Sequence, residues 1–283
     1  MLKIGLVDHH LNNYHSDKFL ELLHGPLAEQ ECRIVAAWES NPVGESDWCA
    51  KNKVLRLASP EEVARQVDAV MVMAPDNIEF HRRFCEIVLP FKKPTLIDKF
   101  LAPNIADAEA IVALAKKHGT RIMSSSSLAF AMELEQHLPM FKENISEMFV
   151  RGFGNWEGYG VHTIAMALRV FGGKFSRLID TGNPATRLVT VDYGSGKTLS
   201  IEVREAENQH EVCPWQFGFR VGKKYISAVI KDYDGFYQNL MKYAAVFFKG
   251  GESEYPIDSA LATVAILELA TKSQQAGGVW INR

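Results

Sequence analysis

Short apolar runs alternate with amphipathic stretches along the first third of the chain. Nearly continuous apolar runs are typical of strands that are covered on both faces, as in a parallel sheet. They predict strands at residues 3–7, 33–38, 67–73, 95–97 and 121–123. Helices are predicted at residues 17–24, from Ser59, at 77–88 and at 105–118. Strands that alternate with helices imply βαβ crossovers and a doubly wound parallel sheet.

The pattern changes after about Ser124. A helix (132–137), a strand (147–153) and a helix (160–171) lead into paired strands at 187–193 and 198–203, and at 216–221 and 225–230. Each pair flanks a glycine-containing turn, which indicates a β-hairpin. Two helices (236–248 and 258–274) and a short strand (279–281) close the chain. We therefore predict an α/β domain over residues 1–123 and an α+β domain with a mainly antiparallel sheet over 124–283, with the terminal helix packing back on the first domain as an option.

Composition narrows the class of protein. A hydrophobic fraction of 47% and a charged fraction of 23% over 283 residues are those of a globular protein with a sizeable core. The formal charge of −3 offers no basic excess for nucleic acid. No apolar run approaches the roughly 20 residues of a membrane span, and we expect no signal peptide before the first strand. The cysteines are far apart, so we expect free thiols in a cytoplasmic protein.

The loop after the first strand is the first place to look for a ligand, because doubly wound sheets bind ligands at the carboxyl ends of their strands. Dinucleotide-binding domains carry GxGxxG in that loop, so that the backbone approaches the pyrophosphate. Here Asp8, His10 and Asn13 stand where the glycines are expected, with His9 between the first two. A carboxylate at Asp8 repels a pyrophosphate unless it points away. We expect these four residues to line an altered phosphate turn.

The second predicted strand ends in Ala37-Trp38-Glu39. An acidic residue at this position accepts hydrogen bonds from the ribose hydroxyls of an adenosine. Its charge also repels the 2′-phosphate of NADP, so Glu39 favours NAD.

A metal site is an alternative interpretation of the same loop. Asp8, His9, His10 and His15 are all potential ligands, and a different enzyme acting on a sugar could use them. Because His9 and His10 are adjacent, however, their side chains are expected to diverge in a polar loop. We therefore predict no metal.

Four segments, taken in order, cover nearly the whole chain. They are VDAVMVMAPDN (67–77), DKFLA (98–102) with a helix that ends in AKKHG (115–119), GYGVHTI (158–164) and ATKS (270–273). Together they resemble the "VDAVxIATPN", "EKPLA" and "D-x-G-x-H" motifs and the terminal "A-x-x-S" helix of the Gfo/Idh/MocA oxidoreductases, the family of glucose–fructose oxidoreductase and inositol dehydrogenase.

The resemblance implies a Rossmann domain followed by an α/β domain whose open sheet forms an oligomer interface, as a dimer or tetramer. It implies hydride transfer between NAD or NADP and a sugar or cyclitol carbon. Lys99 then hydrogen-bonds the substrate hydroxyl and polarises the developing alkoxide, and His162 is the acid/base.

The resemblance also suggests residues that surround the ligands. Pro75 and Asn77 approach the cofactor through the loop after the third strand, unless they only form a turn. Trp156 and Tyr159 either stack on a sugar ring or belong to the core.

The chain departs from the family's motifs in the proposed cleft. Phe100 replaces the proline after the lysine, and Asp98 replaces the glutamate before it. Gly158 stands where an aspartate assists the histidine, with Glu157 as a possible substitute, and Ala165 stands where many relatives carry an acidic residue. These losses support an alternative, a non-catalytic relative that acts as a ligand-binding, regulatory or scaffold protein.

Overall fold

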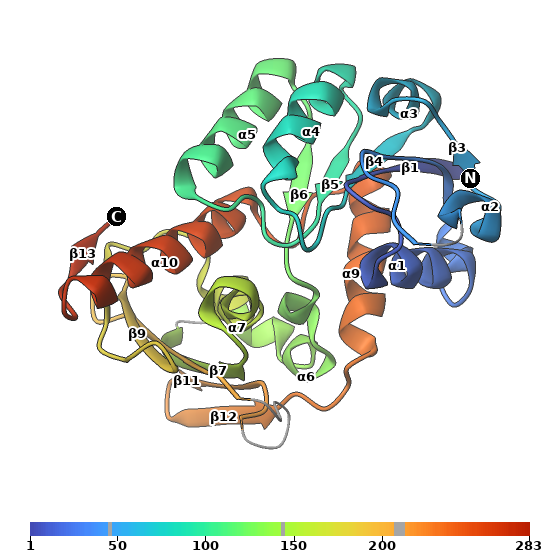
Figure 1. Cartoon of the computed structure of the whole chain (residues 1–283). Helices are drawn as coiled ribbons and strands as arrows, with labels where there is room; N and C mark the ends of the chain where they lie inside the picture. The colour runs from blue at the N-terminus through green and yellow to red at the C-terminus, as the bar shows by residue number, and fades with distance from the viewer. Residues whose placement is uncertain (45–46, 143–144, 207–212) are drawn as a thin grey trace. The chain divides into compact units, whose positions relative to one another are not determined.

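The computed structural model describes residues 1–44, 47–142, 145–206 and 213–283 (Figure 1). The chain forms two compact units: Met1–Ser125 with Leu240–Ile257, and Ser126–Asn239 with Asp258–Arg283. Helix α9 (Gly235–Phe248) therefore begins in the second unit and ends in the first. All four cysteines are buried free thiols, as predicted. Within the described residues, no helix is both long and apolar enough to cross a bilayer.

The first unit is built on a parallel six-stranded sheet. Its strands are β1 (Leu2–Asp8), β2 (Cys32–Glu39), β3 (Leu55–Arg56), β4 (Ala69–Val72), β5 (Thr95–Ile97) and β6 (Ile122–Ser124). They lie in the order β3-β2-β1-β4-β5-β6, and every neighbouring pair is parallel. The order reverses between β1 and β4, which is the switch point where such sheets bind ligands. The predicted doubly wound sheet is confirmed.

Helices cover both faces of this sheet. They are α1 (Tyr14–His24), α2 (Trp48–Asn52), α3 (Pro60–Gln66), α4 (Phe80–Val88) and α5 (Ile105–His118), with short 3-10 turns at Ala28–Gln30 and Leu89–Phe91. Figure 1 shows α3, α4 and α5 on one face, and α1 with the end of α9 on the other. The double cover explains why β4 is entirely apolar and buried.

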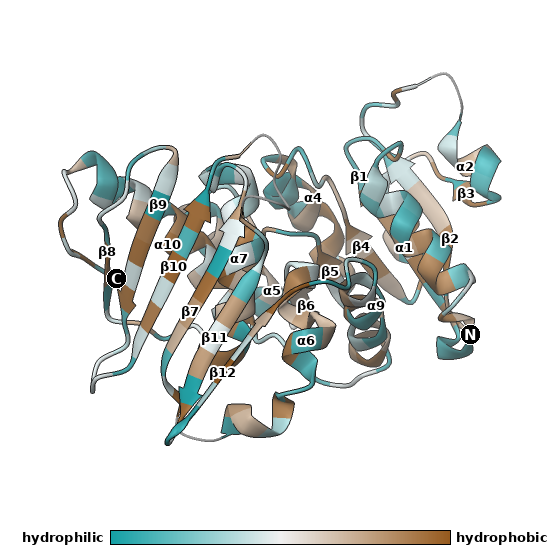
Figure 2. Cartoon of the chain, turned by 90° about the horizontal axis from the view of Figure 1, so that it is seen from below, coloured by the Kyte–Doolittle hydropathy of each residue, from teal (hydrophilic) through white to brown (hydrophobic). Residues whose placement is uncertain are grey.

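The second unit carries a mixed seven-stranded sheet. Its strands are β7 (Ile145–Phe153), β8 (Arg177–Asp180), β9 (Thr186–Asp192), β10 (Thr198–Arg204), β11 (Gln216–Val221), β12 (Lys224–Val229) and β13 (Ile281–Asn282). They lie in the order β12-β11-β7-β10-β9-β8-β13, and only the β7–β10 pair is parallel. Hydropathy alternates along β7, β9 and β10 (Figure 2), which indicates that one face is packed and the other is not.

Helices of the second unit pack on one face of this sheet. They are α6 (Met132–Glu135), α7 (Trp156–Phe171) and α10 (Ile257–Gln275), with 3-10 turns at Ser127–Phe130 and Leu138–Lys142. Helix α7 contacts β7 and β10. Side chains also join α7 to α10, because Trp156 Nε1 donates to the Leu267 carbonyl at 3.0 Å and Ser259 Oγ donates to the Leu168 carbonyl at 3.3 Å.

Several element boundaries differ from the prediction. Strands β3 and β8 and helix α2 were not predicted, because each is only two to five residues long and shows no periodicity. Helix α7 begins at Trp156 rather than at residue 160, because the Asn155 side chain caps it and two glycines in its first turns hide the helical pattern. Helix α4 begins at Phe80 rather than at residue 77, because residues 74–77 form a turn closed by a hydrogen bond from Asn77 N to the Ala74 carbonyl.

Candidate functional site

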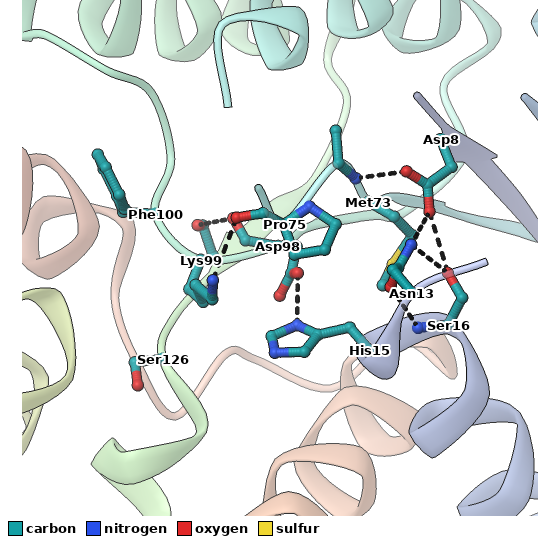
Figure 3. Close-up of polar contacts among 12 residues, drawn as sticks. Asp8, Asn13, His15, Ser16, Met73, Pro75, Asp98, Lys99, Phe100 and Ser126 are labelled. Atoms are coloured by element: carbon teal, nitrogen blue, oxygen red, sulfur yellow. Dashed lines mark hydrogen bonds and ion pairs between the residues drawn. The ribbon is translucent and has the colours of Figure 1, made fainter. Parts of the chain in front are cut away.

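Asp8 is buried at the carboxyl end of β1 and bridges the switch point (Figure 3). Its Oδ1 accepts the Ala74 N–H, just beyond β4, at 2.9 Å. Its Oδ2 accepts hydrogen bonds from Asn13 Nδ2 at 2.9 Å and from Ser16 Oγ at 3.0 Å. Burial raises the pKa of Asp8 to about 6, although these hydrogen bonds oppose the rise. The carboxylate thus points into the unit and is not displayed on the surface of the turn.

Asn13 closes the turn with its side chain. Its Oδ1 accepts the Ser16 N–H at 2.9 Å and caps helix α1, and its Nδ2 donates to the His10 carbonyl at 2.7 Å. In a glycine-rich turn the backbone alone adopts the sharp bend. Here two of the three residues at glycine positions, Asp8 and Asn13, hold the bend by bonding to each other.

His9 and His10 follow Asp8 and are both half-buried. His9 Nδ1 lies 2.8 Å from Ser40 Oγ, and its ring stacks on Phe80 at 4.1 Å between centroids. The two histidine rings lie 5.5 Å apart at an interplanar angle of 67°. Among the described residues, no three His, Cys, Asp or Glu side chains are grouped so that they could hold a metal ion.

Glu39 ends β2, and the structure surrounds its carboxylate with donors. Oε2 accepts the Leu11 N–H at 2.6 Å, and Oε1 accepts a hydrogen bond from Arg56 Nη2 at 2.7 Å. The Glu39 side chain is only 1% exposed. The acidic residue expected to bind ribose is therefore at the strand end, but it is engaged with protein groups.

Lys99 directly follows β5 and is half-buried. Its Nζ donates to the Pro75 carbonyl at 3.1 Å, so the lysine reaches from the end of β5 to the loop after β4 (Figure 3). The Lys99–Phe100 peptide bond is cis. Pro75 is buried, and Asn77 is half-buried in the turn that begins at Ala74, with its Nδ2 donating to Glu79 Oε1 at 3.4 Å. An ammonium group carries three N–H donors, so one bond to Pro75 does not exhaust Lys99.

Two histidines lie near Lys99, and neither was predicted to accompany it. His15 Nδ1 lies 2.6 Å from Asp98 Oδ2, and both groups are buried. Burial tends to raise the pKa of Asp98, but the charges of His15 and Lys99 and hydrogen bonds from both outweigh it and keep that pKa below its usual value. His81 is fully buried against the carbonyls of Met73 and Phe100, so it ties together the loops after β4 and β5.

No sequence signal pairs these groups. His15 and Asp98 are 83 residues apart, and the contact follows from the parallel sheet, which brings the start of α1 to the end of β5.

In the second unit, His162 lies on α7 and is half-buried. Its Nδ1 lies 2.8 Å from Ser126 Oγ, a buried hydroxyl that also accepts the Leu128 N–H at 3.2 Å. The rings of Tyr159 and Trp215 meet the imidazole edge to face, with centroids 5.5 and 5.8 Å away. Neither Ser126 nor Trp215 was predicted as a neighbour of the histidine, because they lie 36 and 53 residues away in the sequence.

Gly158 lies in the first turn of α7, and its N–H donates to Asn155 Oδ1 at 2.7 Å. A Cβ added at this position would lie 2.9 Å from that same oxygen. The position that carries an aspartate in the family is thus a tightly capped helix start in this chain. Glu157 is exposed and Ala165 is buried.

The two predicted stacking residues have different environments. Trp156 is 3% exposed, and the guanidinium of Arg187 lies over its ring at 4.6 Å. With its indole N–H bonded to α10, Trp156 packs between elements of the second unit. Tyr159 is 37% exposed and contacts Phe153 and His162. Of the two, only Tyr159 has an exposed side chain.

The strand order 3-2-1-4-5-6 and the bridged switch point define a Rossmann-type nucleotide-binding unit. The model of the Gfo/Idh/MocA family, described as an oxidoreductase family with an NAD-binding Rossmann fold, matches residues 6–126. The predicted resemblance to this oxidoreductase family is therefore confirmed, and the family model covers residues 6–126. A comparison with curated protein sequences gave no match.

Solved structures match over the full length. A putative myo-inositol dehydrogenase from Sinorhizobium meliloti is 13% identical, with a TM-score of 0.83 over 100% of this chain and 99% of that one. The apo scyllo-inositol dehydrogenase from Lactobacillus casei is 11% identical, with a TM-score of 0.79 over 100% and 98%. An oxidoreductase from Agrobacterium radiobacter, solved with NAD⁺, L-tartaric acid and magnesium, is 13% identical, with a TM-score of 0.75 over 99% and 98%. At these identities the similarity shows the shared fold.

Proposed function

We propose that the protein is an NAD-dependent oxidoreductase that transfers a hydride to or from a carbon–oxygen centre of a sugar or cyclitol. The observation that carries the proposal is Lys99, which follows β5 in a family-matched Rossmann unit and is anchored by its ammonium group to the Pro75 carbonyl. The inositol dehydrogenases among the structural neighbours support the substrate class.

The residues of the first unit fit a dinucleotide at most points. Asp8 turns its carboxylate inward, so it does not oppose a pyrophosphate at the start of α1. His9, His10 and Asn13 are the residues that would line the phosphates, with Pro75, Asn77 and Lys99 towards the nicotinamide. When bound, NAD supplies the acceptor or donor of the hydride. Glu39 can accept the adenosine ribose only if Arg56 moves away from it.

The charges around Glu39 favour NAD over NADP. Glu39 and Asp47 are two carboxylates that share one guanidinium, that of Arg56. The cluster keeps a net charge of −1, which repels a 2′-phosphate.

Proton movement is assigned to Lys99 and His162. The Lys99 ammonium donates a hydrogen bond to the reacting oxygen and stabilises negative charge there. His162 takes or gives the hydroxyl proton through Nε2, because Ser126 holds Nδ1 and thereby fixes the orientation of the ring. Ser126 thus takes the orienting role that the aspartate has in the family's motif. Tyr159, which is partly exposed beside His162, offers a face for the sugar ring.

A catalytically silent relative is the second candidate, and the engaged Glu39 favours it. One experiment separates the two. Purified protein is titrated with NAD by calorimetry and is then assayed with a panel of inositols and aldoses by the absorbance of reduced nicotinamide. The proposal expects binding, together with turnover that Lys99→Met reduces by about 10²-fold or more. If NAD binds but no member of the panel is turned over, the catalytically silent relative is favoured. If NAD does not bind at millimolar concentration, the NAD-dependent enzyme is rejected.

We also propose, from the family resemblance, that copies of the chain associate as a dimer or tetramer through the open face of the second sheet. The half-exposed face of β9 and β10, with Leu188 41% exposed, is compatible with this arrangement. Light scattering gives the mass in solution, and a monomer would reject the interface.

A further inference from the structure

Arg56 lies on the edge strand β3 at the same end of the sheet as Glu39. Its guanidinium is held by two carboxylates. Nη2 lies 2.7 Å from Glu39 Oε1 and 2.8 Å from Asp47 Oδ1, and Nε lies 3.2 Å from Asp47 Oδ2. Paired, charge-assisted contacts of this kind are the strong ones in proteins.

Glu39 has no exposed surface to offer a ligand while this network is intact. One of its oxygens accepts the Leu11 N–H, the other accepts the Arg56 N–H, and the side chain is 1% exposed. In a Rossmann unit, however, a carboxylate at this strand end accepts the ribose hydroxyls of the dinucleotide. Arg56 and a ribose therefore compete for the same carboxylate.

The network allows Arg56 to leave Glu39 without becoming unpaired. Asp47 binds the guanidinium through both Nε and Nη2, and its Oδ1 also accepts the Cys49 N–H at 2.9 Å as the N-cap of α2. The Arg56 side chain is 34% exposed, so the guanidinium has room on its solvent side. A ribose that displaces it meets Glu39 still positioned by Leu11.

We propose that Arg56 sets the affinity of this protein for NAD by competing with the adenosine ribose for Glu39. The inference rests on the proposed function, because it concerns how the same nucleotide site accepts its cofactor. Binding requires the Arg56–Glu39 contact to open, so the wild-type chain binds NAD more weakly than its fold permits. Arg56 is thus a residue that sets cofactor affinity and that the family motifs do not include.

The test measures NAD affinity directly by isothermal titration calorimetry on the full chain. Arg56→Met removes the competitor, and the dissociation constant for NAD is expected to fall about 10-fold or more, which is the range for one hydrogen bond to a charged group. The double variant Arg56→Met/Glu39→Gln is expected to lose that gain. Arg65→Met removes an exposed arginine of α3 in the same unit and is the matched control.

Each outcome has a defined meaning. A dissociation constant for NAD that is unchanged or higher in Arg56→Met overturns the inference. A gain in NAD affinity that persists in the double variant also overturns it. A selective loss of NADP binding in Arg56→Met also overturns it, because Arg56 would then be a ligand of the 2′-phosphate. Arg56→Gln, which keeps an amide donor near Glu39, is expected to show a smaller gain than Arg56→Met and serves if the methionine variant does not fold.

The proposed function and this inference can fail separately. Wild-type binding of NAD reports on the proposed function, whereas the difference between variants reports on the competition. If the wild type binds and Arg56→Met binds no better, only the competition is rejected. If no variant binds NAD, both are rejected.

Discussion

Asp8 couples the stability of the protein to pH in a direction opposite to that of most carboxylates. Burial raises its pKa from 3.8 to about 6, so the native state binds this proton more tightly than the unfolded chain does. The stabilising contribution is fully present below the unfolded pKa and is lost as the pH rises through 6. One pKa unit corresponds to about 1.4 kcal/mol, so the unfolding free energy is expected to fall by about 3 kcal/mol as the pH rises from below 3.8 to neutral.

The perturbation that isolates this effect is Asp8→Asn, which cannot ionise. Asparagine loses part of the hydrogen bonding to Ala74, Asn13 and Ser16, and that cost is largely independent of pH. The difference in unfolding free energy, variant minus wild type, is therefore expected to rise by about 3 kcal/mol between about pH 3.5 and pH 7.5.

Urea unfolding followed by tryptophan fluorescence at a series of pH values measures the Asp8 effect, because Trp38 and Trp48 report on the first unit. Asp68→Asn removes an exposed carboxylate of the same unit and controls for the loss of a negative charge. A constant difference between Asp8→Asn and wild type over the whole pH range would refute the reasoning.

Three further substitutions test other contacts. Gly158→Asp places a Cβ 2.9 Å from the capping oxygen of Asn155, so it should lower the unfolding free energy by about 1 kcal/mol. Urea unfolding measures this cost, and a stabilising effect would contradict the close contact at the helix cap. Ser126→Ala removes the hydroxyl that holds His162, so it should lower kcat about tenfold with little change in KM. Ser126→Thr keeps a hydroxyl and should restore kcat. Equal losses of kcat in both variants would contradict the orienting role of Ser126. Gly5→Ala forces a Cβ to within 2.3 Å of a valine methyl of α3, and should cost about 1–3 kcal/mol in thermal unfolding.

Much of the fold could be predicted because its signals are local. The apolar runs of β1 and β4 are long and continuous, and α5 shows both its Asn104 cap and its Gly119 end in the sequence. Strand β3 could not be found in this way. It has two exposed residues, and it exists because β2 offers it an edge.

The candidate site was less predictable, because its contacts join residues that are distant in the sequence. The positions of Asp8, Glu39 and Lys99 at strand ends follow from the pattern of strands. Their partners do not, since the salt bridge from Arg56 to Glu39 depends on a strand that the pattern does not reveal. Likewise, one of the donors to the buried Asp8 carboxylate, the Ala74 N–H, comes from a loop 66 residues away.

The path of α9 has a consequence for how the chain is made. The first unit needs Leu240–Ile257, and the buried face of α9, with Leu240, Met241 and Ala244, belongs to its core. When the ribosome has synthesised the first 125 residues, the first unit is therefore still incomplete. Its apolar surface stays uncovered until α9 is made, which happens only after strands β7 to β12 have been synthesised. Shortening the chain at the end of β6 should thus yield an aggregating fragment, whereas exchanging this unit between relatives requires the transfer of two separate segments and three junctions in the chain.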